Sequence, residues 1–176
     1  MKLVVGLGNP GKEYENTRHN TGRIVVGIIE KKLQDSKIKF ITPDTFMNNS
    51  GKAVLPFIKT KKDLQNLIVI YDDIDLPLGK MKISFNKSSG GHNGLESVIK
   101  KLKSQEFLRI RIGLSPATPK GVVRKPKGEK AVLNFLLGEY KKSELETLKK
   151  LGKIVAEAVE MFFTEGKDKT MSIYNN

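Results

Sequence analysis

The most informative absence in this chain of 176 residues is cysteine, of which it has none. Disulfides, thiol nucleophiles and thiolate metal ligands are therefore excluded. The chain has only two histidines, whereas metal-dependent hydrolysis uses three or four clustered ligands, so we expect no catalytic metal. A serine nucleophile in a G-x-S-x-G elbow is missing too, which leaves few routes to hydrolytic chemistry.

Long apolar runs are also absent. No stretch of eighteen apolar residues occurs, as a transmembrane helix would need. The first residues, Met1-Lys2-Leu3, continue directly into a predicted strand instead of a signal peptide. We therefore expect a soluble cytoplasmic protein.

Positive charge is plentiful, with a formal net charge of +13 and a pI of about 9.8. Such an excess favours a phosphate-rich partner, because lysine and arginine bind nucleic acid without needing to recognise its sequence. A generally lysine-rich composition would give the same number. Charge alone leaves DNA, RNA and an anionic membrane surface open.

Strand and helix patterns alternate along most of the chain, which predicts one α/β domain over residues 1–176, built as a three-layer sandwich around a mixed sheet. Lys80, Lys82 and Ser84 alternate with apolar residues, and so do Arg109 and Arg111, which predicts strands with a basic outer face. Residues 115–130 are rich in proline, lysine and glycine and predict a mobile basic loop. The predicted strands are 2–5, 38–41, 66–71, 80–86 and 107–114, and the predicted helices are 21–34, 54–59, 95–102, 133–137 and 143–163.

The first glycines form a misleading motif. Gly6, Gly8 and Gly11 spell the dinucleotide-binding pattern G-x-G-x-x-G after a strand. That pattern needs a helix to begin inside it, so that amide groups face a pyrophosphate. Pro10 has no N–H and disfavours a helical conformation at Asn9. We therefore interpret the glycines as sharp turns and not as a cofactor site.

Polar side chains gather in three loops that each follow a predicted strand. Such loops are where α/β proteins place their chemistry. A histidine oriented by a carboxylate, with asparagines as neutral donors, suits general-base activation of water at an ester or amide carbonyl. Each residue also has a structural alternative: a solvent-exposed loop histidine, a turn-capping aspartate, helix-capping asparagines, or Phe46 as part of the core. The polar set is Asn9 and His19 in the first loop, Asn48 in the second, and Asp72 with His92 and Asn93 following.

These segments resemble the bacterial peptidyl-tRNA hydrolases. The similarity covers nearly the whole chain in order, and several long motifs together are far more specific than one glycine pattern. The motifs are VGLGNPG at 5–11 with Tyr14 and TRHN at 17–20, TFMNNSGK at 45–52, DDIDLP at 72–77, GGHNGL at 90–95 and FLRIRIG at 107–113.

The resemblance implies cleavage of the ester between a peptide and the 3′-terminal ribose of tRNA, with no metal or organic cofactor, by a monomer without a membrane partner. His19 would activate water, Asp72 would orient its imidazole, and Asn9 would contact the substrate carbonyl. The implied substrate-binding residues are Tyr14, Phe46, Asn48 and Asn93. A non-catalytic RNA-binding protein on the same scaffold is the alternative.

Two departures from the family pattern concern the tRNA end and one sheet edge. Arg111 matches a member of the family's 5′-phosphate clamp, but Ser84 stands where its usual lysine partner is expected. Lys82 or Lys87 would then take over that contact. The chain also runs almost directly from Gln34 to Ile38, where the family usually has a strand hairpin.

Overall fold

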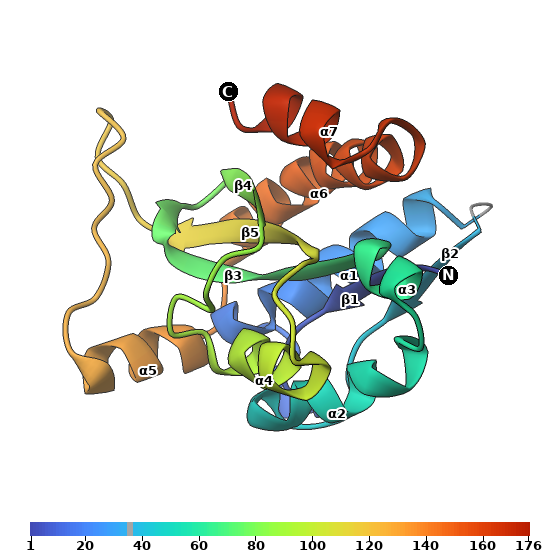
Figure 1. The fold of residues 1–176 in the computed structure, drawn as a ribbon. Coiled ribbons are helices and arrows are strands. Elements are labelled where there is room, and N and C mark those ends of the chain that lie inside the picture. Colours follow the sequence, from blue (N-terminus) through green and yellow to red (C-terminus); the bar gives the residue numbers. More distant parts are fainter. Residues whose placement is uncertain (35–36) are drawn as a thin grey trace.

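In the computed structural model, which describes residues 1–34 and 37–176, one mixed sheet runs through the middle of the molecule (Figure 1). Its described strands lie in the order β2-β1-β3-β5-β4. Adjacent strands are parallel except β4, which is antiparallel to β5. The strands are β1 (Lys2–Gly6), β2 (Ile38–Ile41), β3 (Leu67–Pro77), β4 (Met81–Phe85) and β5 (Leu108–Ser115).

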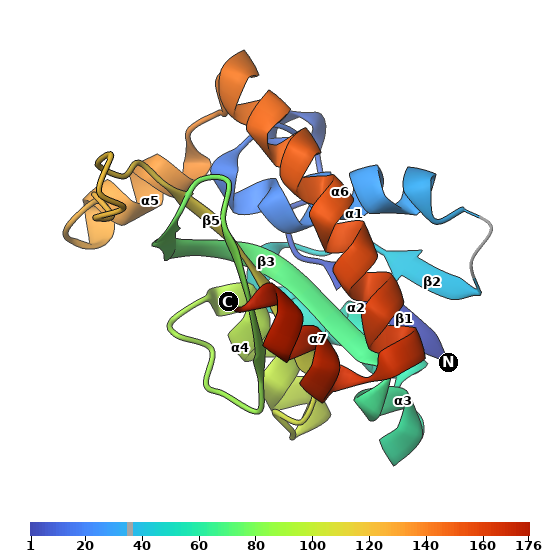
Figure 2. The same ribbon diagram turned by 90° about the horizontal axis from the view of Figure 1, so that it is seen from above.

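Helices cover both faces of the sheet (Figures 1 and 2), which confirms the predicted α/β sandwich with a mixed sheet. On one face lie α1 (Thr21–Lys32), α6 (Lys142–Glu165) and α7 (Lys167–Tyr174). On the other lie α2 (Ser50–Val54), α3 (Lys61–Gln65) and α4 (Asn93–Leu102). Helix α5 (Glu129–Leu137) lies at the margin. Short 3₁₀ helices are η1 (Lys12–Tyr14), η2 (Arg18–Asn20), η3 (Met47–Asn49) and η4 (Leu55–Phe57).

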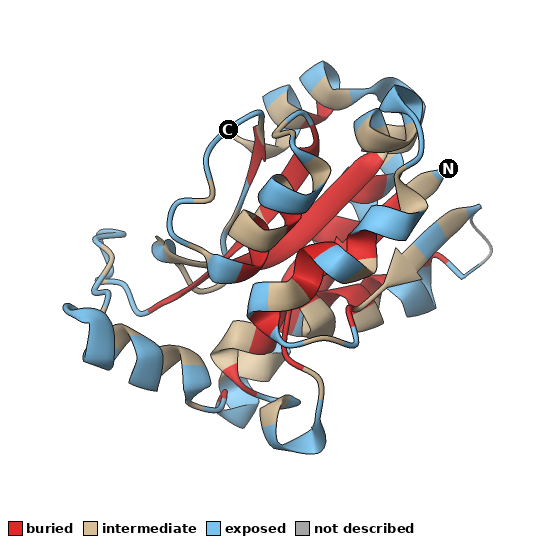
Figure 3. Cartoon of the chain, turned by 60° about the horizontal axis from the view of Figure 1, so that its bottom comes forward, coloured by how far each residue is buried: buried red, intermediate tan, exposed pale blue. Residues whose placement is uncertain are grey.

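Strand β3 divides the hydrophobic core into two clusters. Ile68 and Ile70 pack with the α1 and α6 side, while Leu67 and Val69 pack with the α2 and α4 side. All four are fully buried, as the red central strands of Figure 3 illustrate. An uninterrupted apolar sequence is what a strand covered on both faces requires.

The glycines of the misleading motif serve close packing. A Cβ atom on Gly6 would lie 2.3 Å from the carbonyl oxygen of Gly22, and one on Gly22 would lie 2.3 Å from that of Ile70. Helix α1 therefore crosses the sheet at a distance that only glycine permits. After Gly11 the chain forms η1 and not an α-helix, which agrees with our rejection of a dinucleotide site.

Several predicted boundaries were wrong. Strand β3 continues to Pro77, so Asp72 lies inside a strand instead of in a loop. The predicted helix at 54–59 is the end of α2 followed by η4. Helix α5 begins at Glu129, which shortens the predicted 115–130 loop. The predicted basic outer face is also only partly correct, because Ser84 and Arg109 are buried.

The two strands at the edges of the sheet, β4 and β2, have different surroundings. On β4, the side-chain amide of Asn175 accepts from the N–H of Ile83 at 2.7 Å and donates to its carbonyl at 2.8 Å. The C-terminus thereby satisfies part of an exposed strand edge. At the opposite edge lies β2; the shortened segment before it includes positions 35–36, which lie outside the described residues.

No helix in the described part of the chain is long and apolar enough to cross a membrane.

Candidate active site

The site forms where β3 extends beyond its neighbour β1. The last residue pair between these strands is Gly6 with Ile70, while β3 continues to pair with β5 through Asp72 and Asp73. The chain leaving β1 returns past this open edge as η2, which carries His19. Strand length and loop return therefore bring positions 19 and 72 together at the carboxyl edge of the sheet.

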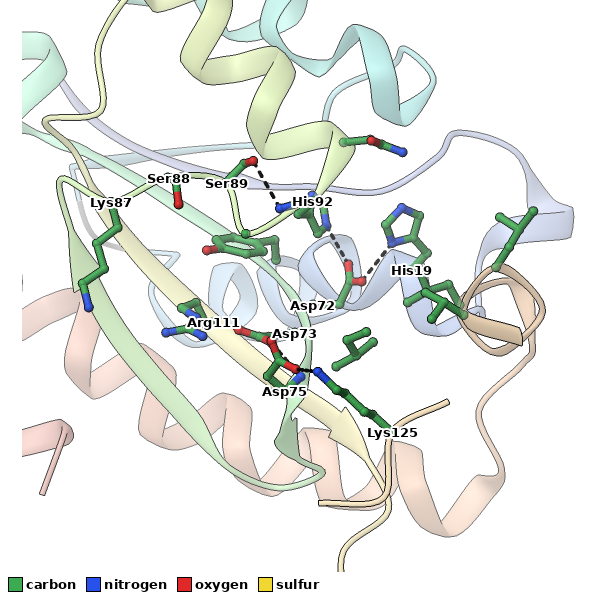
Figure 4. A pocket seen from close by; sticks show the side chains of 18 of the residues that line it. His19, Asp72, Asp73, Asp75, Lys87, Ser88, Ser89, His92, Arg111 and Lys125 are labelled. Carbon is green, nitrogen blue, oxygen red and sulfur yellow. Dashed lines mark hydrogen bonds and ion pairs between the residues drawn. The ribbon is translucent and has the colours of Figure 1, made fainter. Parts of the chain in front are cut away.

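Asp72 bonds to both histidines of the chain (Figure 4). Its Oδ2 lies 2.9 Å from Nδ1 of His19, and its Oδ1 lies 3.0 Å from Nε2 of His92. The Asp72 side chain is only 2 % exposed, against 12 % for His19 and 7 % for His92. The carboxylate is thus sealed from solvent, and His19 is the more accessible of its two partners.

The tautomer of His92 follows from a second hydrogen bond. Its Nδ1 accepts from the backbone N–H of Leu95 at 3.2 Å and so caps helix α4. A neutral imidazole has one N–H, so the proton lies on Nε2 and is donated to Asp72. The three groups could in principle hold a metal, since their ligand atoms lie within 4.8 Å of one another. A metal bound to Nε2 of His92 would displace the proton that lies there when Nδ1 caps helix α4. The hydrogen bonds therefore favour a network in which the histidines share protons with Asp72 and hold no metal.

Asp72 also sets the basicity of His19. Burial disfavours the charged imidazole, but the charge of Asp72 and its hydrogen bond outweigh burial and raise the pKa of His19 above its ordinary value. Burial likewise opposes ionisation of Asp72, yet the two histidines hold the pKa of that carboxyl well below its usual range. Asp72 therefore remains a carboxylate while His19 titrates. Among the described residues nothing bonds to Nε2 of His19.

Hydrogen bonds to Asn20 and Met47 hold Asn9 in place beside η2. Its backbone N–H and carbonyl bond to the side chain of Asn20 at 2.8 and 2.9 Å. Its own Oδ1 accepts from the N–H of Met47 at 2.8 Å. These bonds orient the side-chain amide of Asn9 with its NH₂ group left to donate elsewhere.

The other predicted substrate residues lie more openly. Phe46 is 57 % exposed, so its alternative as a core residue was wrong. Its ring meets that of Tyr14 edge-on, with centroids 6.3 Å apart. Asn48 and Asn93 are exposed. Neither asparagine is the side-chain cap of its helix, so both capping alternatives were also wrong.

A cavity of about 800 Å³ opens in front of Asp72. Of the predicted site residues, the structure brings His19, Asp72, Asn93 and Arg111 together in its lining, whereas Asn9, Tyr14, Phe46, Asn48 and Lys82 are not in that lining. Glycines 90 and 91, Lys87 and the side chains of α5 complete much of the wall.

Cations gather at the β4–β5 end of this cavity. Nε of Arg111 pairs with Asp73 at 2.6 Å, and Lys82 lies directly opposite Arg111 across the two strands. Like charges in that position repel each other. Arg109 is fully buried, and its guanidinium donates to the carbonyl of Ser88 at 2.9 Å. Within the described chain Arg109 forms no ion pair with a carboxylate, and its guanidinium also donates to the carbonyl of Gln105.

The sequence analysis included His92 in the polar set but assigned it no role of its own. Asn93 looked like the better helix cap, because asparagine is a common N-cap and histidine is not. The sequence held one signal that His92 has a role, because both histidines of the chain lie beside motifs of the same polar composition. Only the fold shows that one carboxylate serves both.

A histidine–aspartate pair at the carboxyl edge of a mainly parallel sheet, with neutral amides nearby, is an arrangement that can activate water in a hydrolase. Comparison with known protein families narrows this class of hydrolase. The family model described as "Peptidyl-tRNA hydrolase" matches residues 3–36 and 27–176. The chain belongs to the peptidyl-tRNA hydrolase family.

Relatives in sequence and structure agree with this assignment. The chain is 39 % identical over 189 residues to the peptidyl-tRNA hydrolase of Thermotoga maritima, covering 99 % of this chain and 97 % of that protein. It is 38 % identical over 195 residues to that of a Synechococcus strain, covering 99 % and 83 %. The crystal structure of peptidyl-tRNA hydrolase from Acinetobacter baumannii superposes with a TM-score of 0.82 at 25 % identity, covering 98 % of this chain and 93 % of that one.

Proposed function

We propose that this protein hydrolyses the ester bond between a peptide, or an N-blocked amino acid, and the 3′-terminal ribose of tRNA, and so returns tRNA to translation in the cytoplasm. Family membership supports the reaction. The single observation that carries the mechanism is the 2.9 Å hydrogen bond between Nδ1 of His19 and the buried carboxylate of Asp72.

His19 acts as the general base. With Nδ1–H bonded to Asp72, Nε2 has its lone pair free to take a proton from water as the water oxygen attacks the ester carbonyl. The carboxylate stabilises the imidazolium that forms, as in other histidine–carboxylate pairs. Collapse of the tetrahedral intermediate breaks the bond to the ribose 3′ oxygen, which takes the proton back from Nε2. Peptide acid and free tRNA are the products.

Neutral amides serve the substrate. The free NH₂ of Asn9 is a donor for the substrate carbonyl region, where negative charge develops during attack. Asn48 and Asn93, exposed on η3 and at the start of α4, would bond peptide groups or the attacking water. Tyr14 and Phe46 offer an exposed aromatic surface for the tRNA end.

The cationic end of the cavity is the proposed site for the 5′-phosphate of tRNA. Arg111 and Lys87 both line the cavity, and Lys82 stands beside Arg111 on the neighbouring strand. Because Lys87 lines the cavity and Lys82 does not, we assign the second cation to Lys87 before Lys82. Phosphate would relieve the repulsion between the neighbouring cations Arg111 and Lys82, of which Arg111 pairs with Asp73.

The test is hydrolysis of N-acetyl-aminoacyl-tRNA by the purified protein, beside the same aminoacyl-tRNA with a free amine. We expect release of N-acetyl amino acid and little release of the free amino acid. Tight tRNA binding without hydrolysis of the blocked ester would favour the non-catalytic RNA-binding alternative.

A further inference from the structure

Helix α5 is an apolar helix with no buried residue. Leu133 is 54 % exposed and Leu137 is 43 % exposed, and Figure 3 shows the helix as a pale, solvent-facing element at the margin. Leaving large apolar side chains in water is unfavourable unless something covers them in the working state.

One face of α5 looks into the cavity of His19 and Asp72. Val132, Leu133 and Leu136 line it, together with Ile74 from β3. Positions 132, 133 and 136 lie on one side of a helix, since residues four apart are neighbours on its surface. The cavity therefore has two chemically different ends: cations at β4 and β5, and this apolar wall at α5.

The wall is held in place through the segment that carries His19. The backbone N–H of Arg18 donates to the carbonyl of Gly138 at 3.0 Å, and its guanidinium donates to that of Phe135 at 3.3 Å. The guanidinium also lies 4.5 Å from the centre of the Phe135 ring and 3.6 Å from Glu144. A cation at the last turn of a helix bonds its unpaired carbonyls. Helix α5 is thus fixed beside His19 although none of its residues is buried.

We propose that the α5 wall, formed by Val132, Leu133 and Leu136, binds the side chain of the amino acid that is esterified to tRNA, and so makes the enzyme favour large apolar residues at that position. The inference rests on the proposed function, since His19 must act at the ester carbonyl. The side chain of the esterified residue is attached one carbon away from that carbonyl, and His19 and the wall line the same cavity. Glu129, at the first turn of the same helix, also lines the cavity and disfavours a phosphate at this end.

The experiment compares N-acetyl-leucyl-tRNA with N-acetyl-glycyl-tRNA. We expect the wild-type protein to have a higher kcat/KM for the leucyl substrate. Leu133→Ser should lower kcat/KM for the leucyl substrate about 3- to 10-fold, the scale of one partly exposed apolar contact, and leave the glycyl substrate unchanged. Leu137→Ser is the matched control, because Leu137 is exposed on the same helix but does not line the cavity, and it should change neither substrate.

Equal losses on both substrates in Leu133→Ser, or the same loss in Leu137→Ser, would overturn the inference. So would a wild-type protein that hydrolyses both substrates equally well and remains unaffected by Leu133→Ser. That last result leaves the proposed function standing, whereas a wild-type protein that hydrolyses neither substrate refutes the proposed function itself.

Discussion

Asp72 is the residue on which the candidate site depends, because both histidines direct a hydrogen bond to its carboxylate. A buried carboxylate is costly unless every oxygen has a partner. Here each oxygen has one, and both partners are imidazoles. The sequence predicted the pairing of His19 with Asp72 but not the second imidazole, because nothing in a linear pattern shows which loops converge on one side chain.

The raised pKa of His19 predicts the pH dependence of hydrolysis. The base works only when neutral, so kcat/KM should fall on the acid side with a midpoint above 6.5, the ordinary histidine value. Asp72→Asn removes the charge that raises the pKa and leaves the burial that lowers it. The acid limb should therefore move to lower pH while the plateau rate falls. A pH–rate profile of both proteins checks this, and an unmoved limb in the variant would contradict it.

His92 joins two roles that substitutions can separate. His92→Ala removes the α4 cap and should lower the free energy of unfolding by about 1 kcal/mol. His92→Asn should recover most of that stability, because asparagine is a good N-cap, but it does not restore the N–H donated to Asp72. We expect both variants to hydrolyse N-acetyl-aminoacyl-tRNA more slowly than wild type, measured beside chemical denaturation. Full activity in His92→Asn would show that capping is its only role.

At the scale of elements, the sequence predicted strands and helices well where the spacing of apolar residues determines them. It predicted them less well where packing or pairing with a neighbouring element determines where a strand ends or which side chains are buried. The apolar run ends at Tyr71, but β3 continues because β5 still pairs with it at Asp72 and Asp73. Alternation placed Arg109 on the second face of its strand correctly. It could not show that the side chain is buried there, with its guanidinium bonded to the carbonyls of Ser88 and Gln105.

Asn175, which bonds to the β4 edge at Ile83, gives an element-scale prediction. Asn175→Ala removes two hydrogen bonds to Ile83, each contributing about 0.5–1.5 kcal/mol, so the free energy of unfolding should fall by about 1–3 kcal/mol. Asn176→Ala is the matched control, since Asn176 bonds only within its own exposed terminus. Equal stabilities of the two variants in urea denaturation would show that the edge does not need this cap.

At the scale of the whole molecule, the structure shows where part of the positive charge lies that gives the chain its net charge of +13. The sequence could not choose among phosphate-rich partners, and charge counting alone never would. Lys87 and Arg111 line the cavity that holds His19, and Lys82 lies opposite Arg111 on the neighbouring strand. An anionic substrate is thereby drawn to the face on which the base lies.

Salt dependence tests the phosphate assignment. Lys87→Ala and Arg111→Ala should each weaken tRNA binding and reduce the slope of log Kd against log salt by about 0.7–0.9, the contribution of one phosphate contact. Both should lose the ability to distinguish tRNA with a 5′-phosphate from tRNA with a 5′-hydroxyl. Lys150→Ala, an exposed lysine on α6, is the matched control. A slope that is unchanged in Lys87→Ala but reduced in Lys82→Ala would return the contact to Lys82.

The most direct measurement of the central claim is the turnover of N-acetyl-aminoacyl-tRNA by His19→Ala, with tRNA binding measured in parallel. If His19 is the general base held by Asp72, turnover should fall by about 10²–10⁴ while Kd for tRNA changes little. Turnover equal to that of the wild type, with binding equally intact, would contradict the assignment of His19 as the base.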